Sequence, residues 1–285
     1  MYTVSLKSCF AKVNRAKEHR QALHDYVGSL FESEQNRATL RADADGETGY
    51  HIISLQTVPD LSRAVEEISV RVGDIVHNLR SALDHLVWQL ACLNTNGNPL
   101  WPRRIQFPIE DDPAKFRSRC TPGTQRNHGA WLGEVDQTYH TIIERFQPYH
   151  GMDNFNGPSQ QWWSGYVHEL ALLRNLSDLD KHRLLVTVVL PTTGFEHFFR
   201  IPKAERGLLD WDFNYITDHT MKIGAKVMRT RLSPGPNIPH IEAHMDMVGY
   251  ATPSISFERG GPIVPNMQRI ENFILLLLDT FEKAL

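Results

Sequence analysis

The stretch HNLRSALDHL, residues 77–86, lies in the middle of the longest helix that the sequence predicts, from about residue 60 to residue 93. At about 100° per residue, one side of this helix is apolar and consists of Ile75, Leu79, Ala82, Leu83, Leu86 and Leu90. The opposite side is a polar stripe, which consists of His77, Arg80, Ser81, Asp84 and Trp88, with His85 at its edge. The apolar side predicts that the helix packs in a core. The polar stripe raises the question of what it contacts.

The polar stripe has a structural and a chemical interpretation. Charged side chains on a helix ordinarily face water, and this interpretation needs no function. The stripe contains Trp88 and neither Lys nor Glu, the usual residues of a solvated face. Its composition therefore favours contact with something other than water. Both interpretations stay open at the level of sequence.

Arg80 and His85 are the residues on which the chemical interpretation rests. Arginine is always cationic and donates paired hydrogen bonds to phosphate oxygens, and histidine transfers protons near neutral pH. Together they suffice for metal-free cleavage of an RNA phosphodiester. One group transfers a proton at the ribose hydroxyl, and the other stabilises charge on the phosphate oxygens. The stripe predicts Arg80 and His85 as the catalytic pair, supported by His77, Ser81 and Asp84.

The letters RSALDH fit the R-x4–6-H motif, and in this respect the chain resembles the HEPN superfamily of helical nucleotide-binding proteins. The resemblance implies a four-helix bundle that dimerises, so that two motifs meet in one cleft. It also implies metal-independent ribonuclease activity without a cofactor, catalysed by Arg80 and His85, with RNA as the substrate. Toxin–antitoxin and phage-defence systems are typical settings, and the former implies an antitoxin-like protein partner. HNLRSALDHL followed by DKHR also resembles a pattern of uncharacterised bacterial proteins, from which no function follows.

A second polar cluster, RNLSDLDKHR at residues 174–183, ends a helix predicted from about 161 to 182. Cations at a helix C-terminus are stabilised by the helix dipole, so capping explains them without any function. Alternatively the cluster folds over the polar stripe, where Asp180 orients a histidine and the cations contact phosphate. The residues expected to support the site in this way are Asp180, Lys181, His182 and Arg183.

Histidines of both predicted helices also allow a metal-dependent enzyme as an alternative. Carboxylate–histidine sites occur between the helices of bundles. The ligands in this alternative are His77, His85, His168, Asp180 and His182. A third alternative is a non-catalytic binding or regulatory protein whose polar helix faces pair across a homodimer. Chelator sensitivity separates the metal-dependent enzyme from the other two.

The remaining sequence predicts an α+β fold in a single domain of residues 1–285. About four main helices are expected to form a bundle, at about 5–33, 60–93, 161–182 and 265–285. A β-hairpin is expected between the first two helices, where two strand-like runs flank Asp45 and Gly46. A β-rich insertion at about 184–260 supplies an antiparallel sheet that is segregated from the helices.

The overall composition is typical of a soluble globular protein, since 41% of the 285 residues are hydrophobic and 22% are charged. The formal net charge of -3 excludes bulk electrostatic attraction to nucleic acid as the main property. The three widely spaced cysteines form no disulfide framework, and no stretch is apolar for long enough to cross a membrane. The expected location is therefore the cytoplasm. P-loop, Rossmann and serine-hydrolase motifs do not occur in the sequence.

Overall fold

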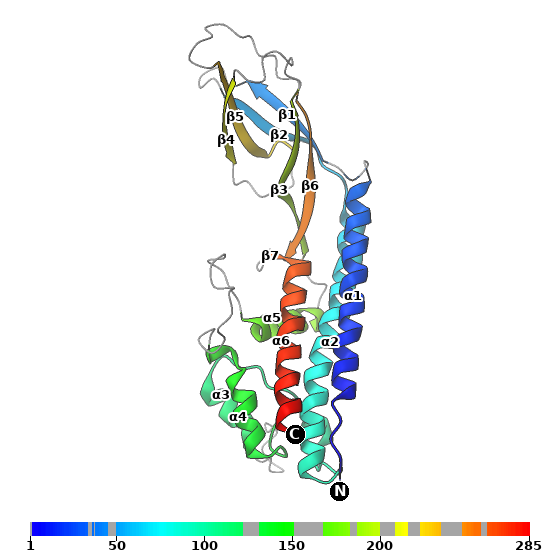
Figure 1. Cartoon of the computed structure of the whole chain (residues 1–285). Coiled ribbons are helices and arrows are strands. Elements are labelled where there is room, and N and C mark those ends of the chain that lie inside the picture. Colours follow the sequence, from blue (N-terminus) through cyan, green and yellow to red (C-terminus); the bar gives the residue numbers. More distant parts are fainter. Residues whose placement is uncertain are drawn as a thin grey trace. The chain divides into compact units, whose positions relative to one another are not determined.

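The protein is an α+β protein, as predicted, because helices and an antiparallel sheet occupy different parts of the chain (Figure 1). This computed structural model describes residues 2–33, 36, 38–44, 50–121, 131–150, 168–182, 187–199, 209–215, 223–234, 247–257 and 261–285. The chain divides into two compact units. One consists of Met1–His24, Glu67–Val186 and Arg259–Leu285, and the other consists of Asp25–Glu66 and Thr187–Glu258. The predicted β-rich insertion falls almost entirely within the second unit.

The first unit is helical. It contains the greater part of two long helices, which are α1 (Lys7–Glu32) and α2 (Ser62–Asn94). It also contains α3 (Pro113–Cys120), α4 (Gln137–Arg145), α5 (Glu169–His182), α6 (Ile263–Ala284), and the 3-10 helices η2 (Pro102–Arg104) and η3 (Pro148–His150). Residues 161–167 of the helix predicted at 161–182 lie outside the described residues. None of the described helices is both long and apolar enough to cross a bilayer.

Local signals in the sequence set the ends of α2. The Asp60 carboxylate accepts a hydrogen bond from the Ser62 backbone N–H at 3.0 Å and so satisfies a free donor of the first turn. This hydrogen bond and the bond from the Ser62 hydroxyl lower the pKa of Asp60. At the other end, Asn96 (φ 51°) and Gly97 (φ 87°) take left-handed backbone conformations. The Gly97 N–H returns to the Cys92 carbonyl at 2.7 Å and closes the helix.

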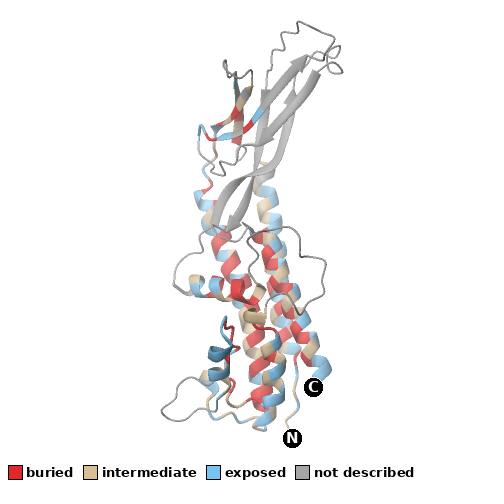
Figure 2. Cartoon of the chain, turned by 90° about the vertical axis from the view of Figure 1, so that its left-hand side faces the viewer, coloured by how far each residue is buried: buried red, intermediate tan, exposed pale blue. Residues whose placement is uncertain are grey.

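The apolar side of α2 lies in the core of the helical unit, as its spacing predicted. Leu79, Leu83, Leu86 and Leu90 have no exposed surface, and buried residues, in red, line the helices of this unit (Figure 2). One ion pair links α1 to α6, because Arg20 Nε and Glu271 Oε2 lie 2.9 Å apart with side chains only 11% and 5% exposed. Buried charges need such partners.

The second unit contains an antiparallel sheet with the strand order β3-β6-β1-β2-β5-β4. Its strands are β1 (Ala38–Ala44), β2 (His51–Thr57), β3 (Thr187–Phe199), β4 (Leu209–Tyr215), β5 (Lys226–Pro234) and β6 (Met247–Phe257). The two-residue strand β7 (Gly261–Pro262) directly precedes α6. β1 and β2 lie between α1 and α2 in the chain and pair from Ala44 with His51 to Thr39 with Thr57. The predicted turn residues Asp45 and Gly46 lie outside the described residues.

A small apolar cluster forms the described core of the sheet unit. It consists of Ala38, Leu40, Ile53, Leu55, Ala225 and Met228, with Val58 packed against it. Leu40 and Leu55 are direct partners across β1 and β2. Alternation of buried and more exposed residues along β1 and β2 shows that these two strands have one face toward the core.

Candidate functional site

Arg80 and Asp84, at the centre of the polar stripe of α2, bind the backbone of Phe107. Arg80 Nη2 donates a hydrogen bond of 2.6 Å to the Phe107 carbonyl. Asp84 Oδ1 accepts a hydrogen bond of 2.9 Å from the Phe107 N–H and lies 3.4 Å from Arg80 Nη2. The spacing of four residues places both side chains on one face of α2. We call this arrangement the Phe107 clamp.

The Phe107 clamp is one part of a larger set of side-chain hydrogen bonds to residues 107–111. Arg174 of α5 donates to the Ile109 carbonyl at 3.2 Å and forms an ion pair of 2.6 Å with Asp111. Gln147, which is fully buried, accepts from the Glu110 N–H at 2.9 Å and donates to the Pro108 carbonyl at 3.0 Å. Side chains from α2, α5 and the residue before η3 therefore hold one short segment.

Residues 107–110 are buried, and the Phe107 side chain has no exposed surface. A buried backbone donor or acceptor without a partner costs about 1–3 kcal/mol, so a segment that is neither helix nor strand needs partners from side chains in a helical core. This requirement explains why the polar stripe contains an arginine and an aspartate. No motif in the sequence pointed to residues 107–111, although the letters FPI at 107–109 are an apolar signal.

The structure does not place Arg80 and His85 side by side on α2. α2 is continuous through both residues, so a spacing of five directs their side chains about 140° apart around the helix axis. The Arg80 side chain is 15% exposed within the clamp. His85 is half-buried and shares a helix row with Ser81 and His77, each four residues from the next. His77 is exposed.

Asp180 of α5 lies against the backbone of Gly73, where a Cβ would overlap its carboxylate. Gly73 is one turn before His77 and about 18 Å along the helix from His85. The second polar cluster therefore meets the polar stripe at its His77 end and does not bring Asp180 to His85. The side chains of Lys181 and His182, and all of Arg183, lie outside the described residues.

His168 caps the N-terminus of α5. Its Nδ1 accepts a hydrogen bond of 3.2 Å from the Leu170 N–H, and its ring contacts Phe273 edge-on with centroids 5.1 Å apart. Burial is the main cause that lowers the pKa of His168, and Arg269 adds to it, whereas Glu169 and Asp111 oppose it. The neutral imidazole is favoured because a protonated Nδ1 cannot accept the hydrogen bond.

Among the described residues, no group of three or more His, Cys, Asp and Glu side chains is arranged to hold a metal ion. Of the ligands in the metal-dependent alternative, His168 caps α5 and Asp180 contacts Gly73. The cysteines are free, and burial raises the pKa of the Cys9 and Cys120 thiols to about 11. Thiols with raised pKa values are poor nucleophiles at neutral pH.

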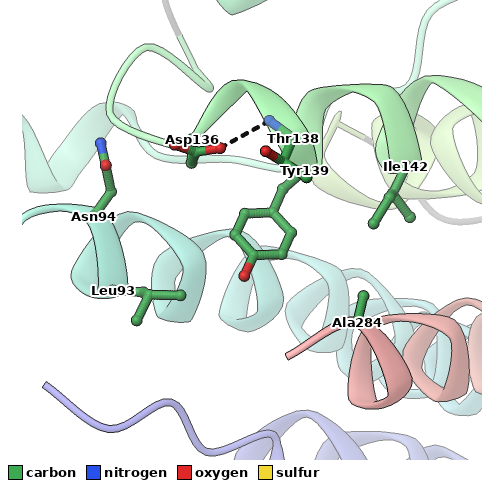
Figure 3. A pocket seen from close by; sticks show the side chains of 7 residues that line it. All are labelled: Leu93, Asn94, Asp136, Thr138, Tyr139, Ile142 and Ala284. Atoms are coloured by element: carbon green, nitrogen blue, oxygen red, sulfur yellow. Dashed lines mark hydrogen bonds between the residues drawn. The ribbon is translucent and has the colours of Figure 1, made fainter.

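A pocket of about 360 Å³ lies where α2 ends beside α4 and α6 (Figure 3). It is lined by Leu93, Asn94, Asp136, Thr138, Tyr139, Ile142 and Ala284. The carboxylate of Asp136 in this pocket already has a structural role, because it accepts a hydrogen bond of 2.8 Å from the Thr138 N–H and caps α4. The pocket contains none of the residues predicted for catalysis or metal binding.

Comparisons with protein-family models, with curated proteins and with solved structures find no match.

Arg80→Ala and Asp84→Ala should each lower the free energy of unfolding by about 1–3 kcal/mol, because each removes a partner of the buried Phe107 backbone. His85→Ala, five residues along the same helix, should cost less. Urea unfolding of the single variants and of the double variant measures the coupling between Arg80 and Asp84. Equal small losses at all three positions would show that the clamp contributes nothing.

His168 should make stability depend on pH. Because folding lowers its pKa, the unfolded chain binds the proton more readily as pH falls below about 6.5. The stability that neutral His168 contributes is therefore fully present above about pH 6.5. It decreases as the pH falls toward the lower pKa that His168 has in the folded state. His168→Asn retains a capping oxygen and should flatten the change between about pH 8 and about pH 5. His24→Gln, at an exposed position of α1, should keep the wild-type slope.

Gly73→Ala and Gly28→Ala form a matched pair that tests the position of Asp180. Both glycines are helical, but only a Cβ at Gly73 meets the Asp180 carboxylate. Gly28→Ala should raise the free energy of unfolding by about 0.5–1 kcal/mol, and Gly73→Ala should gain less or lose stability. The difference should disappear in an Asp180→Ala background. An equal gain at both positions in the native background would place Asp180 elsewhere.

Proposed function

We propose that the protein is a non-catalytic binding or regulatory protein, in which the charged centre of the polar stripe has a structural role. The observation that carries this proposal is the Phe107 clamp. One nitrogen of Arg80 already contacts both the Phe107 carbonyl and Asp84, 2.6 and 3.4 Å away. A phosphate oxygen that used this nitrogen would leave a buried carbonyl without its donor, at a cost that opposes binding.

The polar stripe, extended toward the start of α2 by Val70 and Asp74, forms a partly exposed face that is suited to pairing with a second copy of the chain. Val70, Asp74, His77, Ser81, Asp84 and Trp88 follow one another at alternating spacings of four and three residues, the pattern of a helix–helix seam. Val70 is 53% exposed and Trp88 is 36% exposed. Apolar surface at both ends of a polar seam favours a homodimer. The proposal therefore includes this homodimer, and it also includes a cytoplasmic location.

A metal-independent ribonuclease of the HEPN type is the second candidate, and one observation favours it. His85 takes no part in the Phe107 clamp and lies in one row with Ser81 and His77. In a homodimer two such rows would meet. His85 would transfer a proton as the ribose 2′-hydroxyl attacks the adjacent phosphate, and the 5′-hydroxyl would leave with a proton. Arg80 would then position Phe107, and an antitoxin-like protein would be the expected partner.

RNA incubated with the protein in excess EDTA separates the two candidates. Mixed RNA should stay intact with the wild type and with His85→Ala, Arg80→Ala and the control His24→Ala. Cleavage by the wild type and His24→Ala, but not by His85→Ala of equal folded fraction, would overturn the non-catalytic proposal. Cleavage that appears only when Mg²⁺ or Mn²⁺ replaces EDTA would instead favour the metal-dependent alternative.

A further inference from the structure

Two arginine–tryptophan stacks lie in the helical unit, away from the polar stripe in sequence. The Arg104 guanidinium is 4.6 Å from the ring centre of Trp101, and the Arg119 guanidinium is 4.1 Å from that of Trp131. All four residues are partly exposed. A guanidinium on an indole presents a flat cationic surface that suits both a nucleobase and a phosphate.

The loop of residues 131–135 joins the two stacks. The Leu132 N–H donates to the Arg119 carbonyl at 2.9 Å, which fixes Trp131 beside α3. Glu134 Oε1 accepts from the Trp101 N–H at 2.7 Å. Trp131 and Glu134 are three residues apart, at most about 11 Å of extended chain. The stacks are therefore close enough for a few nucleotides to reach both.

Each stack has a further exposed cation next to it. Arg103 precedes Arg104 in η2, and Lys115 lies four residues before Arg119, on the same face of α3. Both side chains are exposed. We call Trp101, Arg103, Arg104, Lys115, Arg119 and Trp131 the Arg–Trp surface.

The acidic groups near the Arg–Trp surface already accept hydrogen bonds. Glu110 accepts from Arg119 at 2.9 Å, Asp112 caps α3, and Glu134 accepts from two backbone N–H groups. Residues 101–121 include five cations and three anions, and Glu134 adds a fourth anion at this surface. The local balance is therefore slightly positive in a chain whose formal net charge is -3, and Arg103 and Lys115 are among its exposed cations.

We propose that the Arg–Trp surface binds single-stranded nucleic acid, with bases stacked at Trp101 and Trp131 and phosphates at Arg103 and Lys115. Stacking on aromatic rings combined with cations along the backbone is the general mode of single-strand binding. The inference rests on the proposed function, since it names the ligand class of the binding protein. It does not depend on pairing through α2.

Fluorescence anisotropy with labelled strands of about 12 nucleotides tests this surface. Oligo-dT and oligo-U present the same chemistry, and oligo-dT lacks the 2′-hydroxyl that the ribonuclease mechanism requires, so its binding is measured independently of cleavage. Both strands should bind if stacking and charge suffice. Binding of oligo-U alone would identify RNA as the class of strand that this surface recognises. A duplex of the same length should bind more weakly, because its bases are not free to stack.

Trp131→Ala should weaken binding by about tenfold or more, as expected for one lost base stack. Lys115→Ala and Arg103→Ala should each weaken binding and reduce the slope of log K against log salt by about 0.7. Lys283→Ala removes an exposed cation at the end of α6 and should leave binding unchanged. Trp131→Phe keeps an aromatic ring and should retain most of the affinity, which separates stacking from a folding defect.

Absence of binding at about 50 mM salt would overturn the inference, as would equal affinity for the duplex, or affinity unchanged in both Trp131→Ala and Lys115→Ala. These failures differ from failure of the proposed function. Intact RNA without strand binding would leave the non-catalytic proposal standing, whereas strand binding accompanied by cleavage that depends on His85 would overturn that proposal alone.

Discussion

The need to satisfy the buried backbone of residues 107–110 is the constraint on which the rest of the helical unit depends. This segment is buried without being a helix or a strand, so its amide groups cannot find partners within regular secondary structure. Arg80, Asp84, Gln147 and Arg174 supply those partners from different parts of the chain. The same four side chains thereby fix the mutual positions of α2, α5 and the region before η3.

This constraint changes the meaning of the Arg80–His85 spacing. A motif of two residues describes a spacing along the chain, whereas chemistry requires two groups near one reacting atom. On an uninterrupted helix the spacing of five separates the two side chains, and Arg80 is held by Phe107 and Asp84. His85 takes no part in the clamp, but Arg80 of the same helix is not directed to the same reacting atom. A binding function requires no such arrangement.

Two surfaces of the helical unit consequently have different physical characters. The seam on α2 combines exposed Val70 and Trp88 with small polar residues, which suits another helix. The Arg–Trp surface combines rings with cations, which suits a flexible polyanion. The formal net charge of the whole chain does not describe either surface, because the local potential depends on which charged side chains lie nearby. At the Arg–Trp surface Glu110 pairs with Arg119, whereas Arg103 and Lys115 are exposed cations.

The sequence by itself determined the α+β class, the apolar side of α2 and the ends of α2, because periodicity and capping act over a few neighbouring residues. The spacing of Leu79, Leu83, Leu86 and Leu90 was sufficient to predict a buried face. Only the tertiary structure decided what the polar stripe contacts, since Phe107 lies 27 residues from Arg80 and 23 from Asp84. The placement of Asp180 at Gly73 rather than at His85 likewise arises from a contact between segments more than 100 residues apart. No local pattern encodes such contacts.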